Sequence, residues 1–459
     1  MDELLTYITT VISQAKADYC EVRWEEMIFT RFLIKNSLVQ SAEESEVQGG
    51  CIRVLKDGAW GIVTFVELAQ LEKNLSAAIN FAKISSQYSN KIIKLADVYP
   101  QQAIINFPIL ENPCDLSLAY KLGLFTEYSD FARSLPSVDH CVSRYYDETK
   151  KNILVTSEGT RLIQTQLDLY GSLTLSANRK GKSISVPTYG GSSNDFNILR
   201  NIIPEIETVE KHLAQLLQAS PIQAGTYPVV MGQKLASLFI HEAFGHFCEA
   251  DSHMNDARIQ ELMRKGRSLS STCVNIYDSG LQVGTRGYVP FDDEGVPSQR
   301  TDLIRDGKLV GRLHSRETAT WFGEQPTGNA RAISFRFSPI CRMTTISAEP
   351  GELPIEDMIS HVSLGVYADE PYGGKVDGEN FNFVALNVRM IRQGKLAEYL
   401  CPVNLTGSLF HTLSKIKAVS SDYLCKETAG GCGKGGQGPL RVSAGSPHLL
   451  IQKLLVTPR

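Results

Sequence analysis

The sequence predicts an α+β protein with two lobes, each built from mixed or antiparallel sheets with packed helices. The chain has 459 residues, of which 42% are hydrophobic and 21% charged. This is an ordinary globular composition, in a length that exceeds what a single core usually supports. Short strand-like runs bounded by turns occur in both halves, and a few segments have helical spacing. We therefore expect two domains, residues 1–190 and 191–459, with a metal-binding helix in the second.

The first lobe is predicted from helical spacing, strand-like runs and turn signals. Residues 3–16 place apolar side chains at the intervals of an amphipathic helix. Asp57-Gly58 favours a hairpin, because both residues tolerate positive φ. The elements expected after the first helix are strands over 20–23, 29–34, 50–56 and 58–65, a helix over 67–83, proline-containing coil over 99–116, a helix near 116–134 and strands within 138–178.

A polar, glycine-bearing stretch over 189–194 marks the predicted boundary between the lobes. Strand-like runs and turns alternate again beyond residue 270, so the second lobe is also mixed. Its expected elements are a helix over 198–219, a buried strand over 227–231, strand-like runs over 287–291, 303–306 and 309–313, and two strands within 381–400.

Charge and cysteine usage narrow the class of protein. The chain has 46 Lys+Arg against 50 Asp+Glu, a net charge of −4, which argues against a dedicated nucleic-acid binder. It begins Met1-Asp2-Glu3, unlike a secretory signal, and has no run of roughly 18 apolar residues that could cross a bilayer. We expect a cytoplasmic protein. Its ten cysteines form no C-x-x-C pair, so most should be reduced and buried rather than paired in disulfides.

The most informative segment is an apolar helical pattern over 235–251 that contains two histidines and an adjacent acid. His241 and His246 offer neutral nitrogen donors, and Glu242 directly follows the first of them. A zinc hydrolase needs this set, namely two ligands and a general base for the water. The spacing is H-E-x-x-x-H, one residue longer than the familiar helical H-E-x-x-H.

The additional residue changes the expected geometry. On an α-helix, positions i and i+5 diverge by about 140°, so both rings would not easily reach one metal ion. A wider π-type turn would bring them to the same side. Alternatively, the helix could end at Gly245, with His246 in the following turn. We therefore expect a helix that is distorted or terminated between Ala243 and His246.

A purely structural role for the two histidines is the alternative. Two histidines five residues apart also occur by chance, and a histidine on an apolar helix is more often a hydrogen-bonded core residue. Glu242 favours the metal site, because an acid in an apolar run needs a reason to be there. A third donor must come from elsewhere, and the nearby candidates are Cys248, Glu249, Asp251 and His253.

A remote candidate for the third donor is Cys432, which lies in a glycine-rich segment over 428–439. A cysteine among so many glycines has few neighbouring side chains to pack with, so a buried hydrophobic role is poorly supported. Glycines also permit the close backbone approach that delivers a thiolate to a site. No phosphate-loop register fits, because Gly435 follows Lys434. An exposed glycine-rich linker is the structural alternative.

Taken together, these residues resemble the TldD/PmbA family, whose members were once called modulators of DNA gyrase and are regarded as zinc metalloproteases. The resemblance covers the whole chain, and the combination of motifs is specific where any one would be weak. The motifs that carry it are His241-Glu-x-x-x-His246, Asp292-Asp-Glu-Gly-Val-Pro-x-Gln299 with the following 303–311, Gly431-Cys432-Gly-Lys-x-Gly-Gln437, and the shorter segments 58–61 and 224–230.

The resemblance implies a set of roles at the matching positions. His241, His246 and Cys432 would bind Zn²⁺, a water molecule would take the fourth position, and Glu242 would act as general base. The family contains TldD-type members that carry the histidine motif and a partner type that lacks it. This sequence carries the motif and therefore resembles the TldD type.

The resemblance also implies partners and substrates. It implies a dimer, either a homodimer or a heterodimer with a motif-lacking TldE/PmbA-type partner, with the zinc site in an enclosed cavity. Substrates would then be unfolded peptides. Gly373 and Gly374, within 372–377, could line the cavity and pair with an extended peptide backbone. Arg331 could contact substrate or stabilise charge, or it could be a surface or interface residue.

The leading hypothesis is a zinc-dependent peptidase. The alternative is a non-catalytic regulatory or scaffold subunit of a dimeric complex with a structural metal. Glu242 separates the two, because a scaffold has no need of a carboxylate beside a ligand histidine. A nucleic-acid-associated regulator is the least supported, since the sequence shows no basic patch or stacking motif.

Overall fold

The structure is a computed structural model that describes residues 3–179, 181–427 and 431–459. The first part of the chain forms one seven-stranded sheet in the order β3-β2-β1-β5-β6-β4, with β7 also beside β6. All neighbours are antiparallel except β4, which runs parallel to β6. The strands are β1 (Tyr19–Lys35), β2 (Leu38–Lys56), β3 (Ala59–Phe65), β4 (Gln102–Asn106), β5 (His140–Thr156), β6 (Arg161–Arg179) and β7 (Lys182–Ser192).

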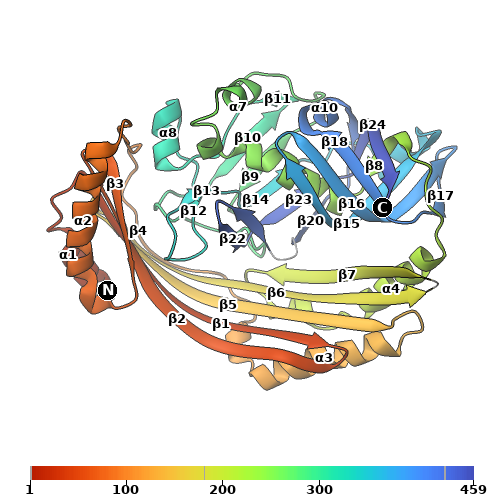
Figure 1. The fold of residues 1–459 in the computed structure, drawn as a ribbon, viewed down its shortest axis with the longest axis horizontal. Helices are drawn as coiled ribbons and strands as arrows, with labels where there is room; N and C mark the ends of the chain where they lie inside the picture. The colour runs from red at the N-terminus through yellow and green to blue at the C-terminus, as the bar shows by residue number, and fades with distance from the viewer. Residues whose placement is uncertain (1–2, 180, 428–430) are drawn as a thin grey trace.

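Four α-helices accompany this sheet, and its long strands curve beneath the C-terminal part of the chain (Figure 1). One core cluster joins α1 and α2 to β1, β2 and β3, and a second joins α3 and α4 to β5, β6 and β7. Ser117 caps α3 by accepting a hydrogen bond from the Tyr120 amide. The helices are α1 (Glu3–Ile12), α2 (Leu71–Tyr88), α3 (Leu118–Ser134) and α4 (Ile203–Gln218), with short 3₁₀ turns at Leu68–Gln70, Pro113–Asp115 and Phe196–Leu199.

The predicted α+β class is confirmed, and most elements of the first lobe are where the sequence placed them. Asp57 and Gly58 adopt φ values of 52° and 75° and form the predicted hairpin. The runs predicted over 20–23 and 29–34 are one strand, β1, because the charged residues between them remain in register with β2. The prediction of coil over 99–116 is wrong at Gln102–Asn106, which form the short edge strand β4. The predicted domain boundary at residue 190 falls inside β7, and the division into two domains stays a prediction.

The C-terminal part contains a closed barrel. Each strand pairs with the next in the order β8-β15-β16-β18-β24, and β24 pairs with β8 to complete the ring. Only β8 and β15 are parallel. The ring strands are β8 (Gly225–Met231), β15 (Leu364–Asp377), β16 (Asn380–Arg392), β18 (Val403–Ser408) and β24 (Leu449–Pro458), with β17 (Lys395–Tyr399) and β19 (Ile416–Val419) added at its side.

A six-stranded sheet and two small strand pairs lie beside the barrel and hold the segments that carry the sequence motifs. The sheet order is β11-β10-β9-β14-β23-β20. The strand predicted over 287–291 is absent; Phe291 makes only an isolated bridge with Pro297. The strands are β9 (Ile276–Ser279), β10 (Arg300–Arg305), β11 (Lys308–Leu309), β14 (Thr345–Ala348), β20 (Leu424–Glu427) and β23 (Ser443–Ser446), and the pairs are β12 (Ala330–Arg331) with β13 (Ile340–Cys341) and β21 (Cys432–Lys434) with β22 (Gln437–Leu440).

One helical segment crosses the core between the barrel and this sheet, and it contains both motif histidines. It consists of α5 (Gln233–Leu238), a π-helix (Phe239–Gly245) and α6 (His246–Cys248). The remaining helices are α7 (Ala257–Leu262), α8 (Arg316–Phe322), α9 (Ile355–Ser360) and α10 (Leu409–Ser414), with a 3₁₀ turn at Ala250–Ser252. No helix of the described residues is long and apolar enough to cross a membrane.

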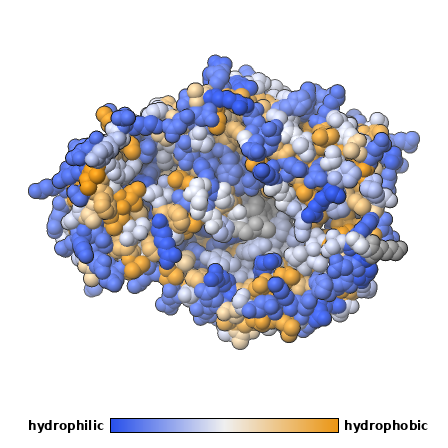
Figure 2. Space-filling model, in the orientation of Figure 1, coloured by the Kyte–Doolittle hydropathy of each residue, from blue (hydrophilic) through white to orange (hydrophobic). Residues whose placement is uncertain are grey.

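Buried ion pairs join the two parts of the chain. Glu294 accepts a hydrogen bond of 2.9 Å from Arg53 of β2, and Asp293 lies 4.0 Å from Arg23 of β1. The ring of Phe335 packs so closely on β2 that a Cβ at Gly49 would lie 2.4 Å from it. The Asp-Asp-Glu-Gly motif is thus a contact between the curved sheet and the part that carries the histidines. Figure 2 shows the molecular face hollowed between these two parts, with hydrophobic side chains in scattered groups.

Candidate metal centre

The two motif histidines lie on the same side of their helix, because the helix widens between them. The π-helix over Phe239–Gly245 takes up the additional residue of the H-E-x-x-x-H spacing. The centroids of the His241 and His246 rings are 5.3 Å apart. The predicted distortion is therefore confirmed, in the π-type form.

Close packing fixes both ends of this helix. At its start, the Asp369 carboxylate of β15 accepts a hydrogen bond of 3.1 Å from the Leu235 amide. At the end of the π segment, a Cβ at Gly245 would lie only 2.1 Å from the sulfur of Met343. A larger residue there would displace the buried side chains of Met343 and Ile346.

Cys432 completes a cluster of three donors. One donor atom each from His241, His246 and Cys432 lies within 4.8 Å of the others, although the cysteine is 186 positions beyond the second histidine in the sequence. The Cys432 sulfur is 3.4 Å from Nε2 of His246. Two of the three side chains are buried, and His246 is partly exposed. The buried Nδ1 of His241 has no hydrogen-bond partner among the described residues.

The electrostatics of the cluster favour a thiolate. Burial alone would raise the pKa of the Cys432 thiol, but hydrogen bonds from His241 and His246 lower this pKa to about 5. For His246 both directions are reversed. Burial alone would lower the pKa of its imidazole, but the bonds to Cys432 and Glu249 raise this pKa to about 10. Without a metal, thiolate and protonated imidazole thus stabilise each other, and a cation could replace the proton.

Glu242 lies at the open side of the cluster. Its two carboxylate oxygens are 4.0 Å from Nε2 of His241 and 3.9 Å from Nε2 of His246. Its side chain is 39% exposed, whereas that of His241 is 2% exposed. The carboxylate therefore faces both the donors and the solvent.

Glu249, one of the nearby candidates for the third ligand, lies behind His246 and outside the donor cluster. Its carboxylate is completely buried and accepts a hydrogen bond of 2.9 Å from Nδ1 of His246, on the far side of the ring from Cys432. Cys248 is buried and His253 contacts the Phe247 carbonyl oxygen. Asp251 pairs with Lys434. The sequence spacing alone could not show that Glu249 binds the second ring nitrogen of His246 rather than acting as a third ligand.

The comparisons with known proteins decide the family. A model described as the PmbA/TldA metallopeptidase C-terminal domain matches residues 224–458, and one described as PmbA/TldA metallopeptidase domain 1 matches residues 20–84. A metalloprotease of Synechocystis is 37% identical over 96% of this chain and 95% of its own length. The chain belongs to the TldD/PmbA family of metallopeptidases.

Two further relatives add detail to this membership. A zinc metalloprotease TldD homolog of Saccharolobus solfataricus is 26% identical over 70% of this chain and 72% of its own length. The crystal structure of TldE from Thermococcus kodakarensis has the same fold, with a TM-score of 0.75 and 17% identity over 99% of both chains. The TldD/PmbA resemblance and the metalloprotease class expected from the sequence are thus confirmed.

The three residues expected to bind substrate lie in different surroundings. Arg331 is buried, and its guanidinium donates to the carbonyl oxygens of Met343 and Arg441 at 2.6 and 2.8 Å. Burial and the neighbouring cation of Arg441 lower its pKa to about 9. These bonds tie two chain segments together, and a substrate role for Arg331 stays a prediction. Gly373 and Gly374 are exposed on β15, at a register shift between Pro371 and Gly374 in its pairing with β16.

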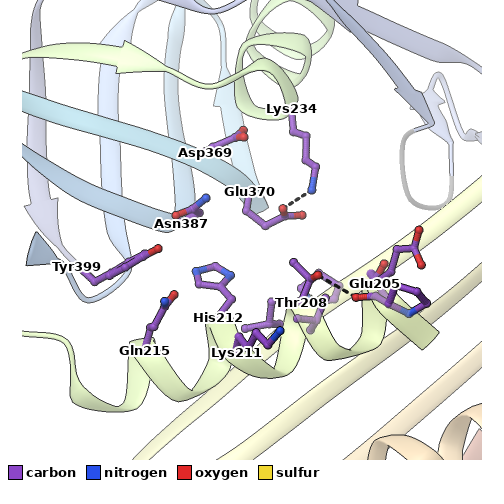
Figure 3. Close-up of a pocket in the computed structure, with 15 residues that line it drawn as sticks. Glu205, Thr208, Lys211, His212, Gln215, Lys234, Asp369, Glu370, Asn387 and Tyr399 are labelled. Carbon is purple, nitrogen blue, oxygen red and sulfur yellow. Dashed lines mark hydrogen bonds and ion pairs between the residues drawn. The ribbon is translucent and has the colours of Figure 1, made fainter. Parts of the chain in front are cut away.

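A polar cavity of about 520 Å³ opens between α4 and the barrel, at the start of the helical segment over 233–248 that carries the candidate ligand histidines, the metal helix. Figure 3 shows Lys234 reaching from the helix toward Glu370, while His212 and Gln215 point up from α4. Glu370 has a φ of 56°, an uncommon conformation for this residue, and its carboxylate pairs with Lys234. The cavity lies on the β15 strand that also carries Gly373 and Gly374.

One helix joins the donor cluster to this cavity, because Lys234 lines the cavity and the two histidines lie farther along the same helix. The π segment keeps residues four apart nearly in line, so Lys234, Leu238, Glu242 and His246 form one stripe. Of residues 233–248, those that are not buried are Gln233, Lys234, Leu238, Glu242, His246 and Phe247.

Proposed function

We propose that the chain is a zinc-dependent peptidase in which His241, His246 and Cys432 hold the metal and Glu242 is the general base. The observation that carries this proposal is the donor cluster with the Glu242 carboxylate about 4 Å from both histidines. Two imidazoles and one thiolate suit zinc, a borderline-soft cation. The relative from Saccharolobus solfataricus, named a zinc metalloprotease, supports this metal.

The residues divide the chemistry between them. A bound zinc ion would supply a Lewis acid that acidifies water and polarises the peptide carbonyl. The half-exposed Glu242 can accept the proton of the attacking water and return it to the leaving amine. The thiolate of Cys432 carries more negative charge than a third imidazole would, which tempers the acidity that the metal confers and leaves more of the proton removal to Glu242.

The substrate we propose is an unfolded peptide that lies extended along the accessible face of the metal helix. The stripe from His246 to Lys234 and the polar cavity at its end support this path. Gly373 and Gly374, four residues or fewer beyond Glu370 on β15, could then pair with the peptide backbone. Only one face of this helix is accessible, and the peptide bonds inside a folded protein could not reach it.

We further propose a dimeric assembly, as a homodimer or with a motif-lacking TldE/PmbA-type partner. The shared fold of TldE from Thermococcus kodakarensis supports a pairing of like folds. The partner would cover the hollowed face between the two parts of the chain (Figure 2) and enclose the site.

Metal content and cleavage of an unstructured peptide, measured on the same samples, test the proposal. We expect Glu242→Gln to retain zinc and to lose on the order of 10²–10⁴ in rate, because only the proton acceptor is removed. Cys432→Ala should lose its zinc at a chelator concentration at which the wild type keeps its zinc bound. Cys114→Ala, at an exposed cysteine, is the matched control and should change neither quantity. Full cleavage by Glu242→Gln would overturn the role of Glu242 as general base, whereas zinc-loaded wild type that cleaves no peptide would favour the scaffold hypothesis with a structural metal.

A further inference from the structure

The hairpin that presents Cys432 has few side chains with which to hold itself in place. Five of the eight residues from 431 to 438 are glycine. Gly431, Gly435 and Gly436 have φ values of 104°, 57° and 74°, which other residues adopt only with strain. Ordering so many glycines is entropically expensive, and they add little hydrophobic contact. Directional bonds must therefore fix the position of the Cys432 sulfur.

Lys434 supplies the bonds that reach the histidine segment. It is two residues after Cys432 on β21, so both side chains lie on the same face of the strand. Its ammonium nitrogen is 3.0 Å from Oε2 of Glu249 and 2.5 Å from Oδ1 of Asp251. It also donates to the Cys341 carbonyl oxygen at 2.9 Å. Three donors of one ammonium group thus meet three acceptors.

The same Glu249 oxygen that receives Lys434 also binds the ligand histidine. Oε2 of Glu249 is 2.9 Å from Nδ1 of His246, and Oε1 accepts a hydrogen bond of 3.2 Å from the Met343 amide. A continuous path therefore runs from Lys434 through Glu249 to His246. It closes a loop with the direct contact of 3.4 Å between His246 and Cys432.

A second set of bonds holds the backbone of the hairpin. Arg342 donates to the carbonyl oxygens of Cys432 and Gln437 at 2.7 and 3.2 Å. The Gln437 side chain donates to the Ser338 carbonyl oxygen at 2.9 Å. These bonds fix the hairpin to the chain around β13, whereas Lys434 reaches both this chain, at Cys341, and the acids that follow the metal helix.

We propose that Lys434 is a positioning residue of the metal centre, which clamps the cysteine hairpin onto Glu249 and Asp251 and so holds the Cys432 sulfur against the ligand face of His246. This inference rests on the proposed function, since it concerns the third ligand of the same site. Lys434 touches neither the donor atoms nor the reacting bond. Lys434 would instead determine the position of the Cys432 sulfur before a metal ion binds.

The first test needs no metal. In metal-free protein, the rate of iodoacetamide alkylation at Cys432, measured by peptide mass spectrometry, reports whether the hairpin is docked. We expect Lys434→Met to raise this rate about tenfold or more, because a buried charge pair is lost, and Lys434→Arg to raise it less. Exposed Cys273 is the reference for reagent activity, and buried Cys248, on α6, reports general unfolding. An unchanged Cys432 rate in Lys434→Met would overturn the clamp.

The second test uses Co²⁺ in place of zinc. We expect Lys434→Met to weaken the thiolate-to-cobalt charge-transfer band while cobalt remains bound by the histidines, and to lower zinc affinity about 10- to 100-fold. If the wild type lacks that band, the proposed ligand set fails. If the wild type shows it and Lys434→Met shows it equally, only the clamp fails.

A second variant keeps the inference testable if Lys434→Met also exposes Cys248. Asp251→Asn leaves Lys434 in place but removes one of its two anionic partners. Cys432 should then become more reactive while Cys248 stays protected. No increase at Cys432 in this variant would also overturn the clamp.

Discussion

At the scale of single residues, the site depends on charged side chains that the interior accepts only with partners. Glu249 is completely buried, yet its pKa is lowered, because the bonds to His246 and Lys434 outweigh the cost of its burial. Arg342 is also fully buried, and its Nη1 and Nη2 donate to backbone carbonyl oxygens, whereas its Nε has no partner among the described residues. A substitution at either position leaves an unpaired polar group beside the donors, so we expect it to disturb the proposed metal site although neither side chain would be a ligand.

Gly245 tests how tightly the helix must approach the neighbouring chain. In Gly245→Ala the new methyl group would lie 2.1 Å from the Met343 sulfur and 2.8 Å from Ile346. We expect a loss of about 1–3 kcal/mol in the free energy of unfolding, measured with denaturant, and weaker zinc binding as the helix moves outward. Gly123→Ala is the matched control, because nothing lies within 4 Å of a Cβ there in α3. It should stabilise by up to about 1 kcal/mol, and an equal loss in both variants would contradict the packing argument.

The donor residues were accessible to sequence reasoning, but their arrangement was only partly so. The acid in an apolar run made Glu242 a candidate general base, and the glycines around Cys432 made it a candidate ligand; both roles stay predictions. Lys434 appeared only as part of a motif, since its partners Glu249 and Asp251 lie more than 180 positions earlier in the chain. A long-range ion pair of this kind leaves no periodicity in the sequence.

At the scale of elements, the π-helix determines what the metal helix shows to solvent. It brings His241 and His246 together and also keeps the accessible stripe in line with the cavity beside Lys234. The helical spacing in the sequence predicted a distorted helix but could not show the stripe, because burial of the other faces depends on the barrel and on β14.

Peptide length tests this stripe. Lys234 and Glu242 are eight residues apart, about 12 Å along a helix, which an extended peptide covers in roughly four residues. We expect Lys234→Met to raise KM several-fold for peptides that extend four or more residues from the cleaved bond toward the cavity, and to leave kcat and the cleavage of tripeptides unchanged. Lys417→Met, at an exposed residue of β19, is the control. A length-independent effect would place the substrate elsewhere.

The elements that the sequence missed have a common physical cause. β4 is a five-residue edge strand in a proline-bearing stretch, so its pairing with β6 outweighs the local coil signals. The run over 287–291 has strand-like residues but joins no strand, because its backbone bonds go to isolated positions, from the Val289 amide to the Gly280 carbonyl oxygen and from the Ser298 amide to that of Pro290. Local propensity was overridden in both directions by tertiary contacts.

At the scale of the whole molecule, buried ion pairs fix the curved sheet against the part that holds the metal centre. The side chains of Arg53 and Glu294 are 6% and 3% exposed, so water screens their interaction little. The Glu294 carboxylate also accepts a hydrogen bond from the Arg316 amide at 2.8 Å. One acid therefore ties β2 to the start of α8.

Glu294→Gln should be destabilising. It leaves the buried Arg53 with Glu21, at 2.7 Å, as its remaining anionic partner, and we expect a loss of about 1–3 kcal/mol in the free energy of unfolding. The matched control is Glu398→Gln, which breaks an exposed pair with Arg392 and should cost less than about 1 kcal/mol. Denaturant unfolding of both variants measures the difference. Equal losses would mean that burial of the first pair has no energetic consequence.

The closed barrel has a consequence for how the catalytic part of the chain can be connected. Gly225, at the start of β8, pairs directly with Val456, near the end of β24. The two ends of the region that holds His241, His246 and Cys432 therefore lie side by side. A short linker could join these ends, and new termini could be opened in an exposed turn such as Asp377–Gly378 between β15 and β16. We therefore expect a circularly permuted chain to keep the closed ring of strands and, with it, the proposed metal site.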